Sequence, residues 1–269
     1  MDAILIGPLA LPAGTVVALI TFSAAVLASL WWQWRGKPVE KWLWLITLAA
    51  LAGARAAFVL RYPEQYSGLL AMLDIRDGGW WWPGALAALP VAILCLWRRP
   101  ALRLALLSST AAAFMALAIS LATLHAMTPE PVPMPDITLE NLQGTPIPLT
   151  QVAQGPTLIN LWATWCPPCR REMPVLADAQ SRYPNVRFVL ANQGETAQAV
   201  RDYLMQADLH FDLPLLDPPM ALGHHAGNGG LPLTLLFDGK GNELARHFGP
   251  LSRASLHHFL TSHLDDPRP

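Results

Sequence analysis

The chain is poor in charge and in cysteine, and each shortage excludes a class of function. Charged residues make up 14% of its 269 residues, and neither half carries the basic tract typical of nucleic-acid binding. Cysteine occurs only at positions 95, 166 and 169, too few for a four-cysteine zinc site. The adjacent His224 and His225 are far from the cysteine pair in sequence. We therefore expect no metal, no organic cofactor and no nucleic-acid partner.

The first 127 residues are typical of a membrane domain. They hold nine basic and five acidic residues, whereas residues 128–269 hold nine basic and fourteen acidic ones. Four apolar runs of 18 to 21 residues predict about four transmembrane helices in contact with the lipid bilayer. They are Val16–Trp34, Trp42–Leu60, Trp80–Trp97 and Leu104–Leu124. Pro83 and Pro90 interrupt the third run, so three spans are an alternative.

The distribution of cations predicts the orientation of these spans. The first run has no basic segment before it and no small-residue cleavage site after it, so we expect it to be retained. With four spans, six cations face one side and two face the other. The six are Arg35, Lys37, Lys41, Arg98, Arg99 and Arg103, and the two are Arg61 and Arg76. The bias places both termini outside a bacterial inner membrane, in the periplasm.

Cys166 and Cys169 lie two residues apart, where the strand-like run 157–162 leads into a helix expected from Cys169 to about Arg182. A thiol in the first turn of a helix lies at the positive end of the backbone dipole, which stabilises the nucleophilic thiolate. A purely structural disulfide would close a two-residue loop and gain little from chain entropy. The spacing therefore favours redox exchange, and Cys95, alone within a span, is interpreted as a buried apolar residue.

The second half predicts one α/β domain. A Pro-rich linker over residues 128–136 is followed by a domain over 137–269. The expected order is a hairpin, strand, helix, strand, helix, two strands and a final helix. Their ranges are 137–149, 157–162, 169–182, 186–191, 196–207, 233–237, 244–248 and 252–264. This order is typical of the thioredoxin fold.

The C-terminal half resembles the TlpA/ResA/DsbE group of membrane-tethered thioredoxin-like proteins. The resemblance is carried by NLWATWCPPCRREMP at residues 160–174 and GLPLT at residues 230–234. It implies that Cys166 is the attacking thiol and that Cys169 is the resolving thiol. It also implies that Pro232 is a cis-proline and that Leu231 pairs with the substrate chain, so Trp165, Leu231 and Pro232 are the expected substrate-binding residues.

Glu172 is the expected proton acceptor. It lies three residues after Cys169, on the same face of the helix. The resemblance implies a carboxylate near the thiols here, whereas ordinary thioredoxins carry a buried aspartate at the position of Asn160. A solvated helix charge is the alternative for Glu172. Pro167 and Pro168 remove two backbone donors from the helix start, which favours a reductant over a strong oxidant.

Residues 4–90 resemble the first part of prolipoprotein diacylglyceryl transferase, most clearly at residues 6–9, 53–55 and 77–84. Pro83 stands where that family has a histidine, so we infer a degenerate module without transferase activity. Arg55 lies within a predicted span, where a charge is costly, so we expect it to pair inside the bundle or reach lipid phosphates.

The sequence thus predicts a membrane-anchored periplasmic thiol:disulfide oxidoreductase, most simply a protein-disulfide reductase. Its expected partners are periplasmic protein disulfides and an upstream membrane thiol reductase that recharges it. The resemblance suggests cytochrome c maturation, or reduction of another periplasmic thiol protein, as the process. A disulfide donor of the same fold is one alternative. A lipid-modifying transferase with a thioredoxin-like appendage is another, and a redox-insensitive scaffold is a third.

Overall fold

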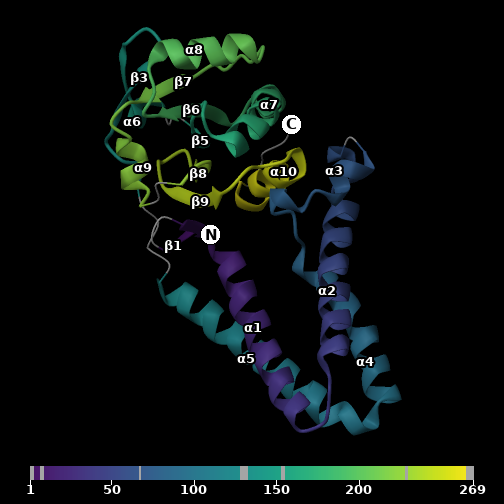
Figure 1. Cartoon of the computed structure of the whole chain (residues 1–269). Helices are drawn as coiled ribbons and strands as arrows, with labels where there is room; N and C mark the ends of the chain where they lie inside the picture. Colours follow the sequence, from purple (N-terminus) through teal and green to yellow (C-terminus); the bar gives the residue numbers. More distant parts are fainter. Residues whose placement is uncertain are drawn as a thin grey trace. The chain divides into compact units, whose positions relative to one another are not determined.

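The structure, a computed structural model, describes residues 3–6, 9–66, 68–127, 133–152, 155–227 and 230–264, with side chains for all of them except 3–6, 9–12 and 76. The chain divides into two compact units (Figure 1). We call Ala13–Ile75 with Gly79–Thr128 the helical unit. The other unit contains residues 129–269, Met1–Pro12 and Arg76–Gly78. In it, β1 (Ala3–Ile6) pairs antiparallel with β2 (Leu9–Pro12).

Three helices of the helical unit are long and apolar enough to cross a membrane: α1 (Ala13–Trp34), α2 (Glu40–Arg61) and α5 (Arg103–Met127). The third predicted span is a 3₁₀ segment, η3 (Trp82–Ala87), followed by the short helix α4 (Ala88–Arg98). Pro83 occupies the first turn of η3. Short turns of helix connect these elements: η1 (Pro63–Gln65), α3 (Leu69–Leu73), η2 (Ile75–Asp77) and η4 (Pro100–Leu102).

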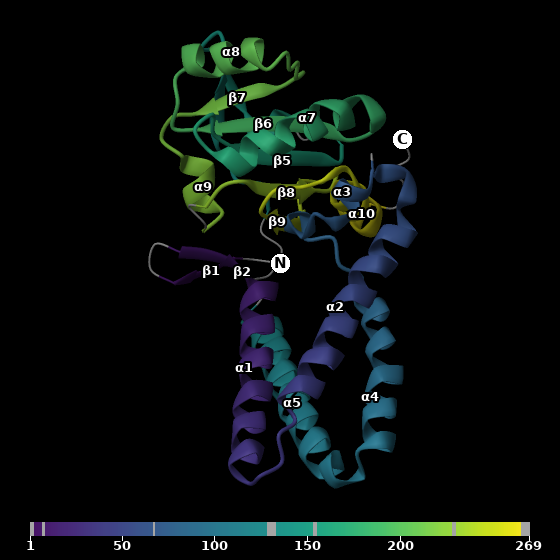
Figure 2. The ribbon, with the colours of Figure 1, turned by 45° about the vertical axis from the view of Figure 1, so that its right-hand side comes forward.

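The helices of this unit pack in antiparallel pairs. α1 packs against α5, and α2 packs against η3 and α4. The chain reverses direction at each connection, so the start of α1 and the end of α5 lie at one end of the unit (Figures 1 and 2). The opposite end has a small apolar core of Trp32, Val39, Cys95, Ala105 and Leu106. Cys95 is buried and free, as expected for an apolar packing residue.

Arg55 is buried within α2 and its charge is satisfied by backbone carbonyls. Its guanidinium donates to the oxygens of Met72 at 2.9 Å, Gly79 at 2.8 Å and Asp74 at 2.7 Å. It also lies over the ring of Tyr66, 5.6 Å from the centroid. The expected pairing inside the bundle is therefore present, and it fastens the segment after α3 to α2.

The C-terminal unit contains a seven-stranded sheet of order β4-β3-β7-β6-β5-β8-β9. The strands are β3 (Thr138–Asn141), β4 (Pro146–Pro148), β5 (Thr157–Trp162), β6 (Arg187–Gln193), β7 (Pro214–Asp217), β8 (Leu233–Phe237) and β9 (Glu243–Phe248). β5, β6 and β7 are parallel, and the remaining pairs are antiparallel. This is a thioredoxin-fold α/β domain, which we call the thioredoxin-like domain.

Alternation along the strands divides the core of this domain between the two faces of the sheet. Leu158 and Trp162 of β5 face α7 (Pro167–Arg182) and α10 (Arg253–His263). Ile159 and Leu161 face α6 (Leu149–Val152) and α9 (Ala221–His225). α8 (Ala197–Gln206) covers the same face as α7. Each buried large side chain contributes about 1.5–3 kcal/mol.

The structure extends the predicted element order. β7 and α9 were not expected, because β7 has four residues and prolines at 218 and 219 follow it directly. α7 begins at Pro167, two residues before the predicted start, and continues through Pro174. Of the predicted linker, residues 128–132 lie outside the described part of the chain. Met134, at its end, is buried and donates its amide to the Gly241 carbonyl.

Candidate active site

Cys166 and Cys169 form a disulfide at the start of α7, with their Cα atoms 5.3 Å apart. Because α7 begins at Pro167, Cys166 is the N-cap residue of this helix. The Cys166 sulfur accepts the Cys169 N–H at 3.3 Å. The two prolines between them have no N–H to offer. One backbone donor of the first turn therefore reaches the attacking sulfur, and the helix dipole adds to it.

Trp165, Leu231 and Pro232 lie on the segments that flank the disulfide in the fold. Trp165 directly precedes Cys166, and 66% of its surface is exposed. The Leu231–Pro232 peptide is cis, as predicted. The Pro232 carbonyl accepts the Gly249 N–H at 3.0 Å. Within the described residues, the backbone N–H and C=O of Leu231 have no hydrogen-bond partner.

Glu172 is buried, so the alternative of a solvated helix charge is wrong. Its side chain is 1% exposed. Oε1 accepts the amide of Asn160 at 2.8 Å, and Oε2 accepts the Leu251 N–H at 2.9 Å. Burial raises the pKa of Glu172 to about 8, although the two hydrogen bonds oppose that rise. A carboxyl with a pKa near neutral can both accept and release a proton at physiological pH.

Asn160 links three elements of the domain, β5, α7 and β8. It stands in the middle of β5, fully buried. Its Nδ2 donates to Glu172 on α7 and, at 3.0 Å, to the hydroxyl of Thr234 on β8. Its Oδ1 is buried and has no hydrogen-bond partner among the described residues. Asn160 was expected only as a substitute for the usual aspartate, and the structure makes it the residue that holds Glu172.

Glu195 was missed from the sequence and fixes the loop that carries the cysteines. Its carboxylate accepts the Thr164 N–H at 2.7 Å and the Thr164 hydroxyl at 2.5 Å. It also accepts the amide of Asn192 at 2.7 Å. Thr164 lies two residues before Cys166, so Glu195 ties the end of β6 to the active-site loop.

A signal for Glu195 was present in the sequence. The polar run Asn192-Gln193-Gly194-Glu195 covers the last two residues of the buried strand β6 and the two residues after it. Functional groups of α/β sheets gather at the carboxyl ends of parallel strands, and β6 is parallel to β5. The run should therefore have been placed beside the cysteine loop.

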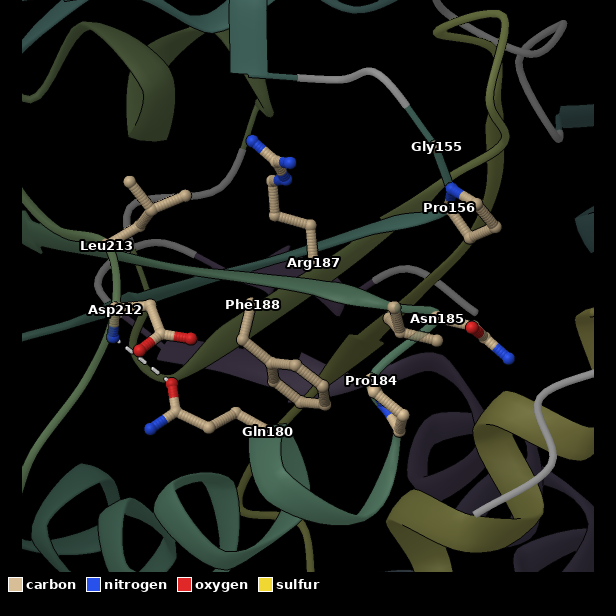
Figure 3. A pocket seen from close by; sticks show the side chains of 10 residues that line it. Gly155, Pro156, Gln180, Pro184, Asn185, Arg187, Phe188, Asp212 and Leu213 are labelled. Carbon is tan, nitrogen blue, oxygen red and sulfur yellow. Dashed lines mark hydrogen bonds between the residues drawn. The ribbon is translucent and has the colours of Figure 1, made fainter.

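A pocket of about 550 Å³ lies at the end of the sheet where β5, β6 and β7 begin, opposite the end at which β5 leads to the disulfide (Figure 3). It is lined by Gly155, Pro156, Gln180, Pro184, Asn185, Val186, Arg187, Phe188, Asp212 and Leu213. The Gln180 side chain is already bonded to the Asp212 N–H and the His210 carbonyl. The pocket contains none of the residues of the redox site. Among the described residues, no cluster of three or more His, Cys, Asp or Glu could hold a metal ion.

Comparison with known proteins finds a family model and several relatives that match the thioredoxin-like domain. A family model described as Redoxin matches residues 130–260. The thiol-disulfide oxidoreductase ResA of Bacillus cereus is 27% identical over 128 residues, which are 47% of this chain and 73% of ResA. The thiol:disulfide interchange protein DsbE of Escherichia coli is 35% identical over 123 residues, 45% of this chain and 65% of DsbE.

The thioredoxin-like protein YneN of Bacillus subtilis is 30% identical over 128 residues, which are 45% of this chain and 73% of YneN. These matches fall on the part of the chain that carries the thioredoxin fold and its paired cysteines. The chain belongs to the thioredoxin-like family of thiol-disulfide oxidoreductases.

Proposed function

We propose that the protein is a membrane-anchored protein-disulfide reductase that acts in the periplasm. The observation that carries this proposal is the disulfide at the start of α7, a helix that also carries a buried carboxyl of raised pKa. The sulfur at the helix start is the candidate nucleophile, and Glu172 is the candidate proton acceptor. Both roles need residues that can change charge state, and Glu172 follows the resolving Cys169 by about one helical turn on α7.

The exchange passes two electrons from the protein to its substrate. In the reduced protein, the Cys166 thiolate attacks one sulfur of the substrate disulfide, and the other substrate sulfur leaves as a thiolate. Cys169 then gives up its proton to Glu172 and attacks the Cys166 sulfur. The mixed disulfide breaks, the substrate leaves with both sulfurs reduced, and Cys166–Cys169 is the disulfide seen in the structure. A donor dithiol from an upstream membrane reductase restores the reduced pair.

The small number of N–H donors around the attacking sulfur supports the proposed direction of electron flow. Thiolates are stabilised by N–H donors, and two of the first three positions of α7 are prolines. A thiolate with few donors makes the disulfide harder to reduce and the dithiol a better reductant. The redox state in living cells tests this: a mostly reduced pair supports a reductase, and a mostly oxidised pair supports a disulfide donor.

Substrate docking is assigned to Trp165, Leu231 and Pro232. The exposed indole of Trp165 offers an apolar surface beside the attacking sulfur. The unpaired backbone groups of Leu231 can bond to an extended substrate segment in the manner of an added strand. Periplasmic proteins with accessible disulfides are the proposed substrates. The resemblance to the TlpA/ResA/DsbE group makes cytochrome c maturation the proposed process.

Four crossings of the inner membrane are proposed for the helical unit. The six residues of η3 rise about 2.0 Å each and the eleven of α4 about 1.5 Å each, together roughly 28 Å if they run end to end. That length is close to the hydrocarbon thickness of a bilayer. Reporter fusions after Trp34, Arg61, Arg98 and Met127 test the count. A fusion after Met127 that is active only in the cytoplasm would overturn the periplasmic assignment.

Trapping tests the enzyme itself. Cys169→Ala leaves the attacking thiol without its resolving partner, so mixed disulfides with substrate proteins should accumulate. Cys166→Ala with Cys169→Ala is the matched control and should trap nothing. Adducts in equal amounts from both variants would contradict the assignment of Cys166 as the nucleophile. The family model does not extend into the helical unit, and the resemblance to a lipid-modifying transferase stays a prediction for a lipoprotein-acylation assay.

A further inference from the structure

A buried amide stands between the proton acceptor and the strand that follows Pro232. The Asn160 side chain donates from one atom, Nδ2, to both Glu172 and Thr234, while its Oδ1 has no partner in the part of the chain that the structure describes. All three side chains are at most 1% exposed. An amide at this depth normally has both of its polar ends paired, because an unpaired buried acceptor costs about 1–3 kcal/mol. The unpaired Oδ1 therefore needs an explanation.

Glu172 is surrounded by neutral donors rather than charges. Its other oxygen accepts the Leu251 N–H, from the segment before α10. Among the described residues, no charged side chain hydrogen-bonds or ion-pairs with it. The titratable groups nearest to it along α7 are Cys166, Cys169 and the exposed Arg170 and Arg171. The observed donors suit the ionised carboxylate, and burial opposes it and raises the pKa of this group.

The present hydrogen bonds suit only one protonation state. A protonated Glu172 must donate through its O–H, and an NH₂ group cannot accept that bond. Turning the Asn160 amide by half a rotation exchanges Nδ2 and Oδ1. Oδ1 would then accept from the Glu172 O–H and from the Thr234 hydroxyl, which can donate as well as accept. The same two contacts would be kept with both donor directions reversed.

We propose that Asn160 is a positioning residue whose amide turns over when Glu172 takes up the proton of Cys169. This inference rests on the proposed role of Glu172 as proton acceptor. The turn lets a proton enter a closed core without moving the backbone and without leaving Glu172 unpaired in either state. The unpaired Oδ1 marks the position that the amide nitrogen takes after the turn. When a donor dithiol recharges the protein, the proton returns to Cys169 and the amide turns back.

The pairing of Asn160 with Glu172 can be tested by exchanging the amide and the carboxyl between positions 160 and 172. Asn160→Asp places two acceptors face to face, so the pair should hold one proton to higher pH and the carboxyl titration should shift upward by about one pH unit or more. Glu172→Gln should remove the titration. The double variant Asn160→Asp with Glu172→Gln restores one amide and one carboxyl, so thermal stability should recover above that of Asn160→Asp alone, and a titrating carboxyl should reappear.

The measurement is an infrared difference titration of the carboxyl band in the full-length protein in detergent, with the cysteine pair oxidised. It is paired with the pH profile of single-turnover thiol release from glutathione disulfide by the reduced protein. Thr234→Val should move the titration, because it removes one of the two partners of the amide. Thr157→Val is the matched control on the far end of β5, where the hydroxyl bonds only to the Gly155 carbonyl, and it should move neither readout.

Two results would overturn the inference. One is an Asn160→Asp variant whose carboxyl titration matches that of the unmodified protein. The other is a double variant no more stable than Asn160→Asp alone. Failure of the proposed function looks different: the reduced protein would release no thiol at any pH, while the infrared titration would still report on Asn160 and Glu172.

Discussion

The two units of the molecule each bury a charge-bearing side chain, and they satisfy it in different ways. In the helical unit, the Arg55 guanidinium is bound by the carbonyls of Met72, Asp74 and Gly79. In the thioredoxin-like domain, Glu172 is held by one side-chain amide and one backbone N–H, next to a redox-active disulfide. Both arrangements cross-link segments that are distant in sequence.

The difference lies in what each group can do. A guanidinium stays protonated in proteins, so Arg55 can act only as a permanent fastener between α2 and the segment after α3. The Glu172 carboxyl has a pKa of about 8 because it is buried, so it can change state under physiological conditions. A fixed charge serves architecture, and a group that titrates near neutral pH can serve proton transfer.

The largest expected effect is on disulfide-reducing activity, and it distinguishes the thiols of the two units. Cys166→Ala should abolish reduction of insulin disulfides, because it removes the sulfur at the helix start that makes the first attack. Cys95→Ala, in the helical unit, should leave the rate unchanged, since that thiol is buried in an apolar cluster. Turnover of insulin by the full-length protein in detergent measures both. Comparable loss from the two substitutions would mean that the helical unit takes part in the chemistry.

The next largest effect is on the pH dependence of the stability of the thioredoxin-like domain. The folded domain keeps the Glu172 proton up to about pH 8, whereas the unfolded chain releases it near 4.5. The free energy of unfolding should therefore fall as pH rises through that window, by a few kcal/mol in total. Pulse proteolysis in urea between pH 5 and pH 8 follows it. Glu172→Gln should flatten this dependence, and an unchanged slope in that variant would assign the effect to another group.

A comparable but smaller loss is expected in the helical unit. Arg55→Ala leaves buried carbonyls without their donor, and we expect a loss of about 3 kcal/mol in the stability of that unit. Insulin reduction by the thioredoxin-like domain should persist. Thermal unfolding in detergent measures the loss, and Arg61→Ala, at the exposed end of α2, is the matched control with little effect. Equal destabilisation by both would show that Arg55 contributes only surface charge.

The smallest effect concerns the loop before the disulfide. In Glu195→Gln the one remaining oxygen can accept from the Thr164 N–H and the Asn192 amide, and the new NH₂ group can donate to the Thr164 hydroxyl, so charge-assisted hydrogen bonds become neutral ones. We expect a loss of about 1 kcal/mol and a several-fold slower exchange. Stopped-flow thiol release reports the rate. Gln198→Ala, whose exposed amide bonds to Asp202 away from the loop, serves as the control and should react at the unmodified rate.

Much of the thioredoxin-like domain could be predicted because its signals are local. The hydrophobic runs 157–162 and 233–237 matched β5 and β8, and the helix predicted over 252–264 is α10, whose N-cap Ser252 accepts the Ser255 N–H. The cysteine spacing and the Pro232 segment were sufficient to name the redox residues. β7 was missed because a four-residue strand that begins with a proline and is followed by two more carries little periodicity, although pairing with β3 and β6 makes it a strand.

The sequence by itself determined the thiol pair, the order of the main strands and helices, and the apolar helices of the first half, since spacing and hydrophobic period are properties of the chain. Only the tertiary structure decided that Glu172 is buried, that Asn160 holds it, and that Glu195 fastens the cysteine loop. Each of these contacts joins segments that are separated in the sequence, Asn160 with Glu172 and Thr164 with Glu195. Burial and hydrogen-bond partners depend on which segments pack together, and no local pattern encodes that.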